Sequence, residues 1–230
     1  MIKAIPFNVA MTCAILNGEK TQTRRVIKWP AEYYPVEYLG EYPMDEDGID
    51  RHWWVMNLSA ETGFIPPHLP GDILWVREPG RVVAYEESAD CQYEWMRIKY
   101  MADGHDVEIN TPWRMSDVWD GNGQKYPYGA PDWVWKKQGI PNGIFKEAAR
   151  TFLKVNKVRI ERVTDISWQD ACAEGFADYG DNPNQGHRHD PVGWFHNLWE
   201  SIYPGTWKRN HWVWVYEFEL TDKPADWPEN

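Results

Sequence analysis

The chain has 230 residues and a formal net charge of −11, from 35 acidic and 24 basic residues. This acidity excludes a protein that grips nucleic acid over a broad basic face, so any contact with nucleic acid must be local. The three cysteines are far apart in the chain, which is typical of a reducing compartment. No apolar run reaches membrane-spanning length and no signal sequence is recognisable, so we expect a cytoplasmic protein that does not enter a membrane.

The first predicted elements are a short strand or arm at residues 1–7 and a helix that ends near Gly18. Asn8 has the side chain that caps a helix N-terminus, and Gly18 fits the position just beyond a helix C-terminus. A strand is expected at residues 21–27, directly after this turn. The stretch between the helix and this strand therefore lies at a structural corner.

Apolar and β-favouring residues predict the remaining strands, at residues 53–58, 73–78, 95–101, 151–163 and 212–220. Two further helices are expected, one from the capping residue Ser167 to Gly175 and one over residues 191–203, where Pro191 fits the first turn. Segments rich in Pro, Gly and polar residues are predicted insertions, at about 29–70, 102–145 and 177–191, followed by a loose tail at 221–230. The pattern predicts one α+β domain over residues 1–220 with a small, strongly curved or barrel-like sheet.

The corner reads NGEKTQTRR at residues 17–25 and carries candidate catalytic groups. Lys20 can serve as a general base where burial and the neighbouring cations Arg24 and Arg25 lower its pKa. Thr23 is a candidate nucleophile, since a hydroxyl needs such a base. The alternative is an ordinary helix-ending turn followed by solvated arginines.

Three further acidic or basic residues are candidates because of their position. Arg77 and Glu78 end a predicted strand and could line a pocket, although an edge ion pair or plain solvation is the alternative. Glu174 falls in the last turn of a short helix, where the helix dipole disfavours a carboxylate. This position predicts a raised pKa and a proton-donor role, with a solvated glutamate as the alternative.

The sixteen tryptophans are the most unusual feature of the composition. Most are expected to anchor the core, and a few could form a platform on which a base stacks. His187, His189 and Asp190 are the only metal-like local cluster, but the surrounding Gly, Asn and Pro favour a solvated loop. We therefore expect neither a metal nor another cofactor.

Gly18, Lys20, Thr23 and Arg25 reproduce the Gly-x-Lys-x-x-Thr-x-Arg signature, and in this the chain resembles the ASCH domain family. The order of elements is similar too, with a Pro-Gly-Asp turn at 70–72 and an Ala-Glu-Gly helix end at 173–175. The GDILWVRE and WVWVYEFE strands resemble those of larger bacteriophage and prophage members. The resemblance implies a PUA-like β-barrel with short flanking helices and long inserted loops.

The small bacterial ASCH amidohydrolases remove the acetyl group from 4-acetylcytidine with a lysine proton acceptor, a threonine nucleophile and a glutamate proton donor. Matched by motif, these residues are Lys20, Thr23 and Glu174. Arg25 would then bind a phosphate or a developing oxyanion. The resemblance thus implies a hydrolase that acts on a modified pyrimidine nucleoside.

Other ASCH proteins are thought to bind or cleave RNA, which leaves other functions open. A non-catalytic module could hold single-stranded RNA or a modified base through Arg24, Arg25 and Arg77, with Glu78 beside them and tryptophans stacking on the bases. A ribonuclease and a phage structural or accessory protein are the remaining alternatives. For the hydrolase and for the binding module, the expected partner is a nucleoside or single-stranded RNA.

Overall fold

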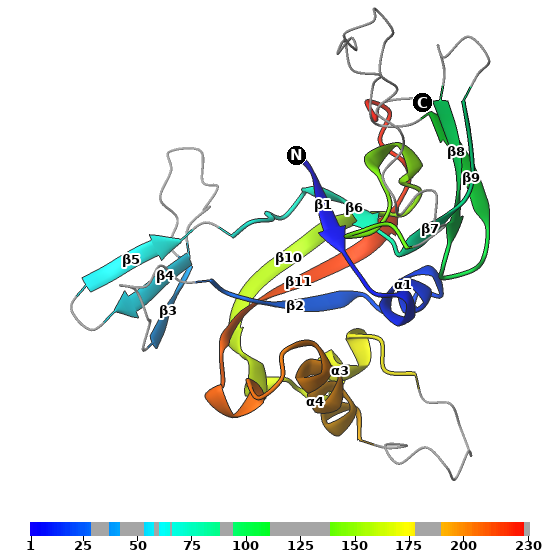
Figure 1. Ribbon diagram of the computed structural model, residues 1–230. Helices are drawn as coiled ribbons and strands as arrows, with labels where there is room; N and C mark the ends of the chain where they lie inside the picture. Colours follow the sequence, from blue (N-terminus) through cyan, green and yellow to red (C-terminus); the bar gives the residue numbers. More distant parts are fainter. Residues whose placement is uncertain are drawn as a thin grey trace, which may run out of the picture. The chain divides into compact units, whose positions relative to one another are not determined.

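The protein has a mixed α+β fold made mostly of strands, with few short helices (Figure 1). The strands form a five-stranded sheet in the order β1-β6-β10-β11-β2 and two three-stranded sheets, β3-β4-β5 and β7-β8-β9. In the part of the chain that the structure describes, none of these sheets closes on itself, so the expected closed barrel is not observed. This computed structural model describes residues 1–28, 37–41, 53–57, 60–64, 66–87, 94–110, 139–177 and 190–227.

The chain divides into two compact units. The first contains Met1, Asn17–Ile73 and Lys154–Leu220, and the second contains Ile2–Leu16, Leu74–Leu153 and Thr221–Asn230. The single domain expected over residues 1–220 stays a prediction. Each unit has strands and helices of its own and is described separately.

The centre of the first unit is β11 (Trp212–Thr221), which lies between β10 (Phe152–Arg162) and β2 (Gln22–Val26). The first five residues of β11 are all buried, as expected for a strand that is covered on both faces. β2 pairs antiparallel with β11, and Thr23 lies opposite Tyr216. The predicted strands at 21–27, 151–163 and 212–220 are thus confirmed.

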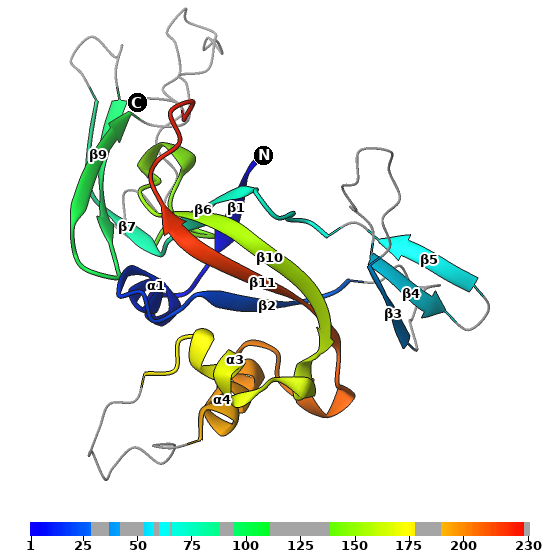
Figure 2. The same cartoon turned by 180° about the vertical axis from the view of Figure 1, so that it is seen from behind.

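Two helices pack on one face of these strands. α3 (Trp168–Ala173) and α4 (Pro191–Ile202) lie side by side in both views (Figures 1 and 2). The 3-10 turn η2 (Val163–Asp165) precedes α3. Apolar side chains of the helices and of β11 form one buried cluster, made of Val163, Ile166, Ala171, Phe195, Trp199, Val213 and Val215.

Local capping explains where these helices begin. Ser167 Oγ accepts a hydrogen bond from the backbone N–H of Asp170, at 3.1 Å. Asp190 Oδ1 accepts one from Gly193 N–H, at 2.8 Å, and Pro191 occupies the first turn of α4. Both caps satisfy N–H groups that the helix itself cannot pair, so both predicted helix starts are confirmed.

A three-stranded meander in the first unit falls inside the predicted insertion at 29–70. It consists of β3 (Glu37–Glu41), β4 (Trp53–Asn57) and β5 (Ala60–Phe64). The strand predicted at 53–58 is confirmed by β4. The other two strands were not predicted, because their sequences lack a regular apolar alternation.

The second unit has β1 (Ile2–Pro6), most of β6 (Ile73–Arg77) and the meander β7 (Gly80–Glu87), β8 (Glu94–Tyr100) and β9 (Asp106–Asn110). It also has the helix α1 (Val9–Leu16), whose start is capped by Asn8 through a 2.8 Å bond from Met11 N–H, and the short turn η1 (Lys146–Ala148). β7 was not predicted, and β9 lies inside the predicted insertion at 102–145. The buried core of this unit consists of Val82, Met96, Ile98, Tyr100, Ile109, Ile140, Ile144 and Ala148.

The C-terminal segment is anchored in the second unit by Trp227, which is buried. The Trp227 ring centroid lies 4.9 Å from that of Phe152 and 6.0 Å from that of Trp75. Lys146 Nζ lies 4.8 Å from the same ring. The expectation of a loose tail is therefore wrong as far as Trp227.

Among the described residues, no helix has both the length and the apolar character needed to cross a bilayer.

Candidate functional site

Backbone hydrogen bonds in the first unit join the signature segment to the end of α3. Lys20 and Glu174 form an isolated antiparallel bridge, and Thr21 N–H donates to the carbonyl of Ala173 at 2.9 Å. Gly18, at a φ of 74°, supplies the left-handed residue that turns the chain before this bridge. The bridge places the Lys20 and Glu174 side chains next to each other.

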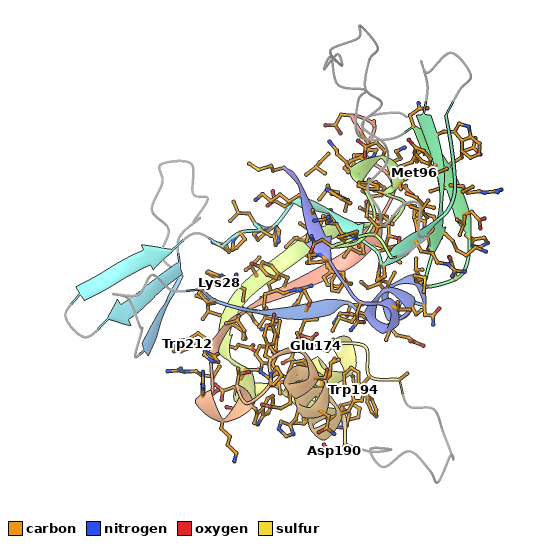
Figure 3. All side chains as sticks on the ribbon, viewed as in Figure 1. Lys28, Met96, Glu174, Asp190, Trp194 and Trp212 are labelled. Atoms are coloured by element: carbon orange, nitrogen blue, oxygen red, sulfur yellow. The ribbon has the colours of Figure 1, made fainter. Side chains whose placement is uncertain are left out.

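The Lys20 side chain is completely buried and is paired with Glu174. Lys20 Nζ donates to Glu174 Oε2 at 2.7 Å and to the Glu174 carbonyl oxygen at 2.8 Å. The second carboxylate oxygen, Oε1, accepts from Arg24 Nη1 at 3.3 Å. Figure 3 shows Glu174 where α3 ends, close to β2. The Glu174 carboxylate thus lies between two cations.

Burial excludes the solvated interpretations that the sequence left open. Lys20 is 2 % exposed, Glu174 3 % and Arg24 4 %. The solvated alternatives for these three residues are therefore wrong. A buried charge is stable only where it is paired and hydrogen-bonded, and the three side chains pair with one another.

The surroundings of Lys20 make its amine easier to deprotonate. Burial is the largest influence and lowers the pKa of Lys20, whereas the charge and hydrogen bond of Glu174 raise it. The positive charges of Arg25 and Arg24 lower it further, and the net result is a pKa below the ordinary 10.5. Lys20 therefore meets the condition, burial beside cations, under which a lysine can act as a general base.

Arg24 and Arg159 extend the pair into an ionic network that the sequence did not predict. Arg24 Nη2 lies 2.8 Å from Glu161 Oε2 and 3.3 Å from Asp170 Oδ2. Arg159 bonds to Asp170 at 2.7 Å and also pairs with Glu161 and Glu217. The one available signal was that Arg159 and Glu161 share a face of a strand, since they are two residues apart. The network holds Arg24, and through it Glu174, in one position.

Thr23 belongs to the other face of β2. Paired residues of an antiparallel ladder share a face, so Arg24 lies on the side of Val215 and Thr23 on the side of Tyr216. Val215 belongs to the cluster under α3 and α4, whereas the Tyr216 ring packs against His68, at 5.2 Å between centroids. Thr23 is buried, and the pleat places it on the side away from Arg24 and its partner Glu174.

Arg25 is half-buried at the same strand. It is hydrogen-bonded to Tyr203, at the end of α4. Burial lowers the pKa of the Arg25 guanidinium, while Tyr203 and Glu174 act in the opposite direction. Because an arginine stays protonated in proteins, Arg25 brings a permanent positive charge into the electrostatic surroundings of Glu174 and Lys20.

Arg77 and Glu78 belong to the second unit. Glu78 is fully buried and accepts from Arg150 Nη2 at 2.8 Å and from Thr151 Oγ1 at 2.6 Å. Arg150 also bonds to Asp103, at 2.7 Å. The solvated alternative for Glu78 is wrong, and its partners lie in its own unit. A role of Arg77 and Glu78 in binding substrate stays a prediction.

The described residues include no group of three or more His, Cys, Asp or Glu side chains arranged to hold a metal ion. His187 and His189 lie outside these residues, and Asp190 caps α4. Trp199, Trp212 and Trp214 are buried, as predicted for core anchors, whereas Trp168 is 57 % exposed.

The chemistry available to the Lys20–Glu174 pair is proton exchange across a short hydrogen bond. An ammonium beside a carboxylate and an amine beside a carboxylic acid differ only in where one proton lies. The second form offers a base and an acid at adjacent positions.

Comparisons with models of known protein families, with curated proteins and with solved structures find no match for this chain.

Proposed function

We propose that this protein is an ASCH-like amidohydrolase that acts on a modified pyrimidine nucleoside of the 4-acetylcytidine type. The observation that carries the proposal is the buried contact between Lys20 and Glu174, with 2.7 Å between the amine and the carboxylate. The signature at residues 18–25 supports the same assignment of roles. A PUA-like arrangement of the curved sheet around this pair is part of the proposal.

The reaction uses one proton of the pair. With the proton on Glu174, the neutral Lys20 amine takes a proton from the attacking water as the water oxygen bonds to the acyl carbon. Glu174 then gives its proton to the exocyclic nitrogen as the carbon–nitrogen bond breaks. The products are cytidine and the free carboxylic acid, and transfer of the proton from Lys20 back to Glu174 restores the pair.

Arg24 and Arg25 have different roles in the proposed reaction. Arg24 bonds to Glu174 Oε1 and fixes the carboxyl group, and is thus a positioning residue. Arg25, which is only half-buried, would stabilise the developing oxyanion or hold a phosphate of the substrate. Thr23 lies on the other face of β2 from Arg24, which favours water as the attacking group over a threonine nucleophile.

Because Lys20 and Glu174 are both buried, a substrate must open a path to reach them. Among the described strands β2 is the last in the order of its sheet, and at its start Lys20 and Thr21 pair with Glu174 and Ala173 at the end of α3. Displacement of the end of α3 from this edge would expose the Lys20–Glu174 pair and leave the β10–β11 ladder intact. We therefore place substrate entry at the outer edge of β2, beside the end of α3.

The test is release of cytidine from 4-acetylcytidine, followed by chromatography, for the wild type beside Lys20→Met and Glu174→Gln. A general acid or base contributes about 10²- to 10⁴-fold, so we expect each variant to lose at least about 100-fold in kcat. Lys154→Met is the matched control, since Lys154 is an exposed lysine of the same unit, and should turn over as the wild type does. Unchanged turnover in Lys20→Met, or no turnover in the wild type, would contradict the proposal.

Thr23→Val separates the two nucleophiles. If water attacks, this variant keeps wild-type turnover and forms no acyl-enzyme. If Thr23 attacks, turnover is lost and mass spectrometry of the quenched wild-type reaction detects an acyl group on the protein. The second result would keep the hydrolase and overturn the choice of water.

A non-catalytic module that holds a modified base is the second candidate. The observation in its favour is that Lys20 and Glu174 satisfy each other and are buried. Such a module would bind intact 4-acetylcytidine in equilibrium dialysis, release no cytidine, and lose affinity in Arg25→Ala. If the wild type releases cytidine and the Lys20→Met and Glu174→Gln variants do not, this second candidate is eliminated.

A further inference from the structure

A group of cations lies at one end of the sheet in the first unit, where β2 ends and β11 begins. Ile27 N–H donates to the Trp212 carbonyl at 3.0 Å, and Val163 N–H donates to the His211 carbonyl at 2.9 Å. These bonds bring the ends of three strands together. Figure 3 shows Lys28 and Trp212 at this same end of the sheet. The basic end patch consists of Lys28, Arg162, Lys208 and Arg209.

The short turn η3 (Trp207–Arg209) supplies two of these cations, Lys208 and Arg209, and both are exposed. Asn210 ends the turn in the left-handed conformation, with a φ of 47°. Its side-chain oxygen accepts from Thr164 N–H at 3.2 Å, which joins η3 to η2, the turn directly after β10. The two exposed cations therefore sit on an anchored turn.

Arg162 is held in place from two sides. Its guanidinium lies 3.9 Å from the centroid of the Trp212 ring, and its Nη1 donates to the Asn210 carbonyl at 3.0 Å. Trp212 itself is buried, so the patch presents the planar cation and not the ring. An arginine that is fixed in this way has little rotamer entropy left to lose when it binds an anion.

The pKa of His211 shows that two cations of the patch, Arg162 and Arg209, lie near the same side chain. Burial lowers the pKa of His211, and the positive charges of Arg209 and Arg162 lower it further. Arg162 at the end of β10 and Arg209 in η3 thus both act on the same imidazole. The patch is a true concentration of positive charge.

The cations of the patch differ from three other basic residues of this unit in forming no salt bridge among the described residues. Lys20, Arg24 and Arg159 each pair with at least one carboxylate. In the described part of the chain, no salt bridge joins a carboxylate to any of the four cations of the basic end patch.

Described acids close to the patch along the chain form no salt bridge to it. Glu161, next to Arg162 in the chain, pairs with Arg24 and Arg159 instead. Glu200 accepts the backbone N–H groups of Gly205 and Trp207, at 2.6 and 2.7 Å. Asp165 is exposed and forms no salt bridge to the patch among the described residues. A protein with a net charge of −11 has many acids with which to neutralise a cation, yet in the part of the chain that the structure describes these four cations form no salt bridge to a carboxylate. The missing counter-charge points to a partner.

We propose that the basic end patch is a binding surface for the phosphate groups of a nucleic-acid strand. Four cations spread over η3, the end of β10 and the residues just after β2 suit a row of phosphates better than one isolated anion. The fixed fork of Arg162 matches the geometry of a phosphate. This surface lies at the other end of β2 from Lys20, eight residues away, which is about 25 Å along an extended strand. The inference does not depend on the hydrolase proposal.

The experiment measures fluorescence anisotropy of a labelled single-stranded RNA of mixed sequence against the concentration of full-length protein, at several salt concentrations. The test variant is Lys208→Ala/Arg209→Ala. The matched control is Lys154→Ala/Lys157→Ala, which removes the same charge from two exposed lysines of the same unit. Circular dichroism confirms that each variant is folded.

We expect the wild type and the control to bind alike and the test variant to bind more weakly. Each phosphate contact on a single strand contributes about 0.7 to the slope of log affinity against log salt, so the test variant should lose about 1.4. No binding by the wild type at low salt, or equal losses in both double variants, would overturn the proposal. Binding to phosphatidylserine vesicles but not to RNA, with the same sensitivity to Lys208 and Arg209, would assign the patch to a membrane and also overturn it.

The test is separable from the hydrolase assay. The patch variants retain Lys20, Glu174 and Arg24, so they should hydrolyse free 4-acetylcytidine at the wild-type rate if the protein is a hydrolase. Failure of the hydrolase proposal leaves the RNA measurement unaffected. Failure of RNA binding likewise leaves the turnover of free nucleoside as it was.

Discussion

Lys20 Nζ donates a hydrogen bond to Glu174 Oε2 across 2.7 Å, although 154 positions separate the two residues in the chain. Lys20 comes just before β2, and Glu174 caps the end of α3. The antiparallel bridge between their backbones brings them together, so the pair depends on the packing of α3 against the edge of the sheet. Both the stability of this region and its proposed chemistry rest on the same contact.

Removing one partner of this pair should destabilise the protein strongly. Lys20→Met leaves the buried Glu174 carboxylate with Arg24 alone, and breaking a buried ion pair costs about 3–5 kcal/mol of the free energy of unfolding. In the double variant Lys20→Met/Glu174→Leu no unpaired carboxylate remains, so the loss should be smaller than the sum of the two single losses. Urea unfolding of the four proteins measures this coupling, and strictly additive losses would contradict a direct interaction.

Arg24 and Arg159 should differ in their effect on stability, although both belong to the ionic network. The Arg24 side chain is fully buried and touches three carboxylates, whereas Arg159 is 18 % exposed and one of its partners, Glu217, is 40 % exposed. We expect Arg24→Met to cost about 3–5 kcal/mol, and Arg159→Met about 1 kcal/mol because water screens its pairs. Equal costs in urea unfolding would show that burial does not set the strength of these contacts.

The proposed reaction also predicts a pH dependence. It needs one proton on the Lys20–Glu174 pair, and the pKa of Lys20 lies below 10.5 because of burial, with Arg25 and Arg24 adding to the shift. The pair therefore loses its last proton below pH 10.5, and kcat should fall as the pH rises through that point. Turnover of 4-acetylcytidine measured between about pH 6 and about pH 10.5 tests this, with Lys154→Met as the reference. A kcat that keeps rising over this range would contradict the role of the pair.

Features that depend on neighbouring residues in the chain could be predicted from the sequence. The caps Asn8 and Ser167 act within three residues of themselves, and both were predicted. The strand at 212–220 was predicted because its Val, Trp, Tyr and Phe residues favour strands in any context. Lys20, Arg24 and Glu174 could be named as candidates because charged residues at a helix end or a strand corner are conspicuous in sequence.

Features that depend on distant partners could not be predicted. Arg159 and Glu161 look like ordinary surface residues of a strand until Arg24 and Asp170 pack against them. β9 reads DVEIN, with two apolar residues, and is a strand because β8 pairs with it. Closure of the sheet depends on which strands become neighbours, and a resemblance to a barrel fold does not fix that order for this chain.

The charge on Asp170 should stabilise the protein above about pH 4 and fail to do so in acid. Burial raises the pKa of Asp170, but the hydrogen bond from Ser167 and the charges of Arg24 and Arg159 outweigh it, so the folded-state pKa lies below the ordinary 3.8. The unfolded chain then binds this proton first, and stability is lost as the pH falls through the folded-state pKa. Asp170→Asn should be less stable than the wild type near neutral pH, and the difference should narrow toward about pH 2. A constant difference in unfolding free energy would argue against this linkage.

Trp227 should contribute to the stability of the second unit as a core residue does. It is 4 % exposed and packs its ring against Phe152 and Trp75. Replacing a buried tryptophan by alanine leaves a cavity and costs about 3–5 kcal/mol, so Trp227→Ala should lower the urea midpoint markedly. Trp168→Ala is the matched control, because Trp168 is 57 % exposed and its loss should change the free energy of unfolding by no more than about 0.5 kcal/mol. If the two variants unfold at the same urea concentration, the C-terminal segment does not stabilise the second unit.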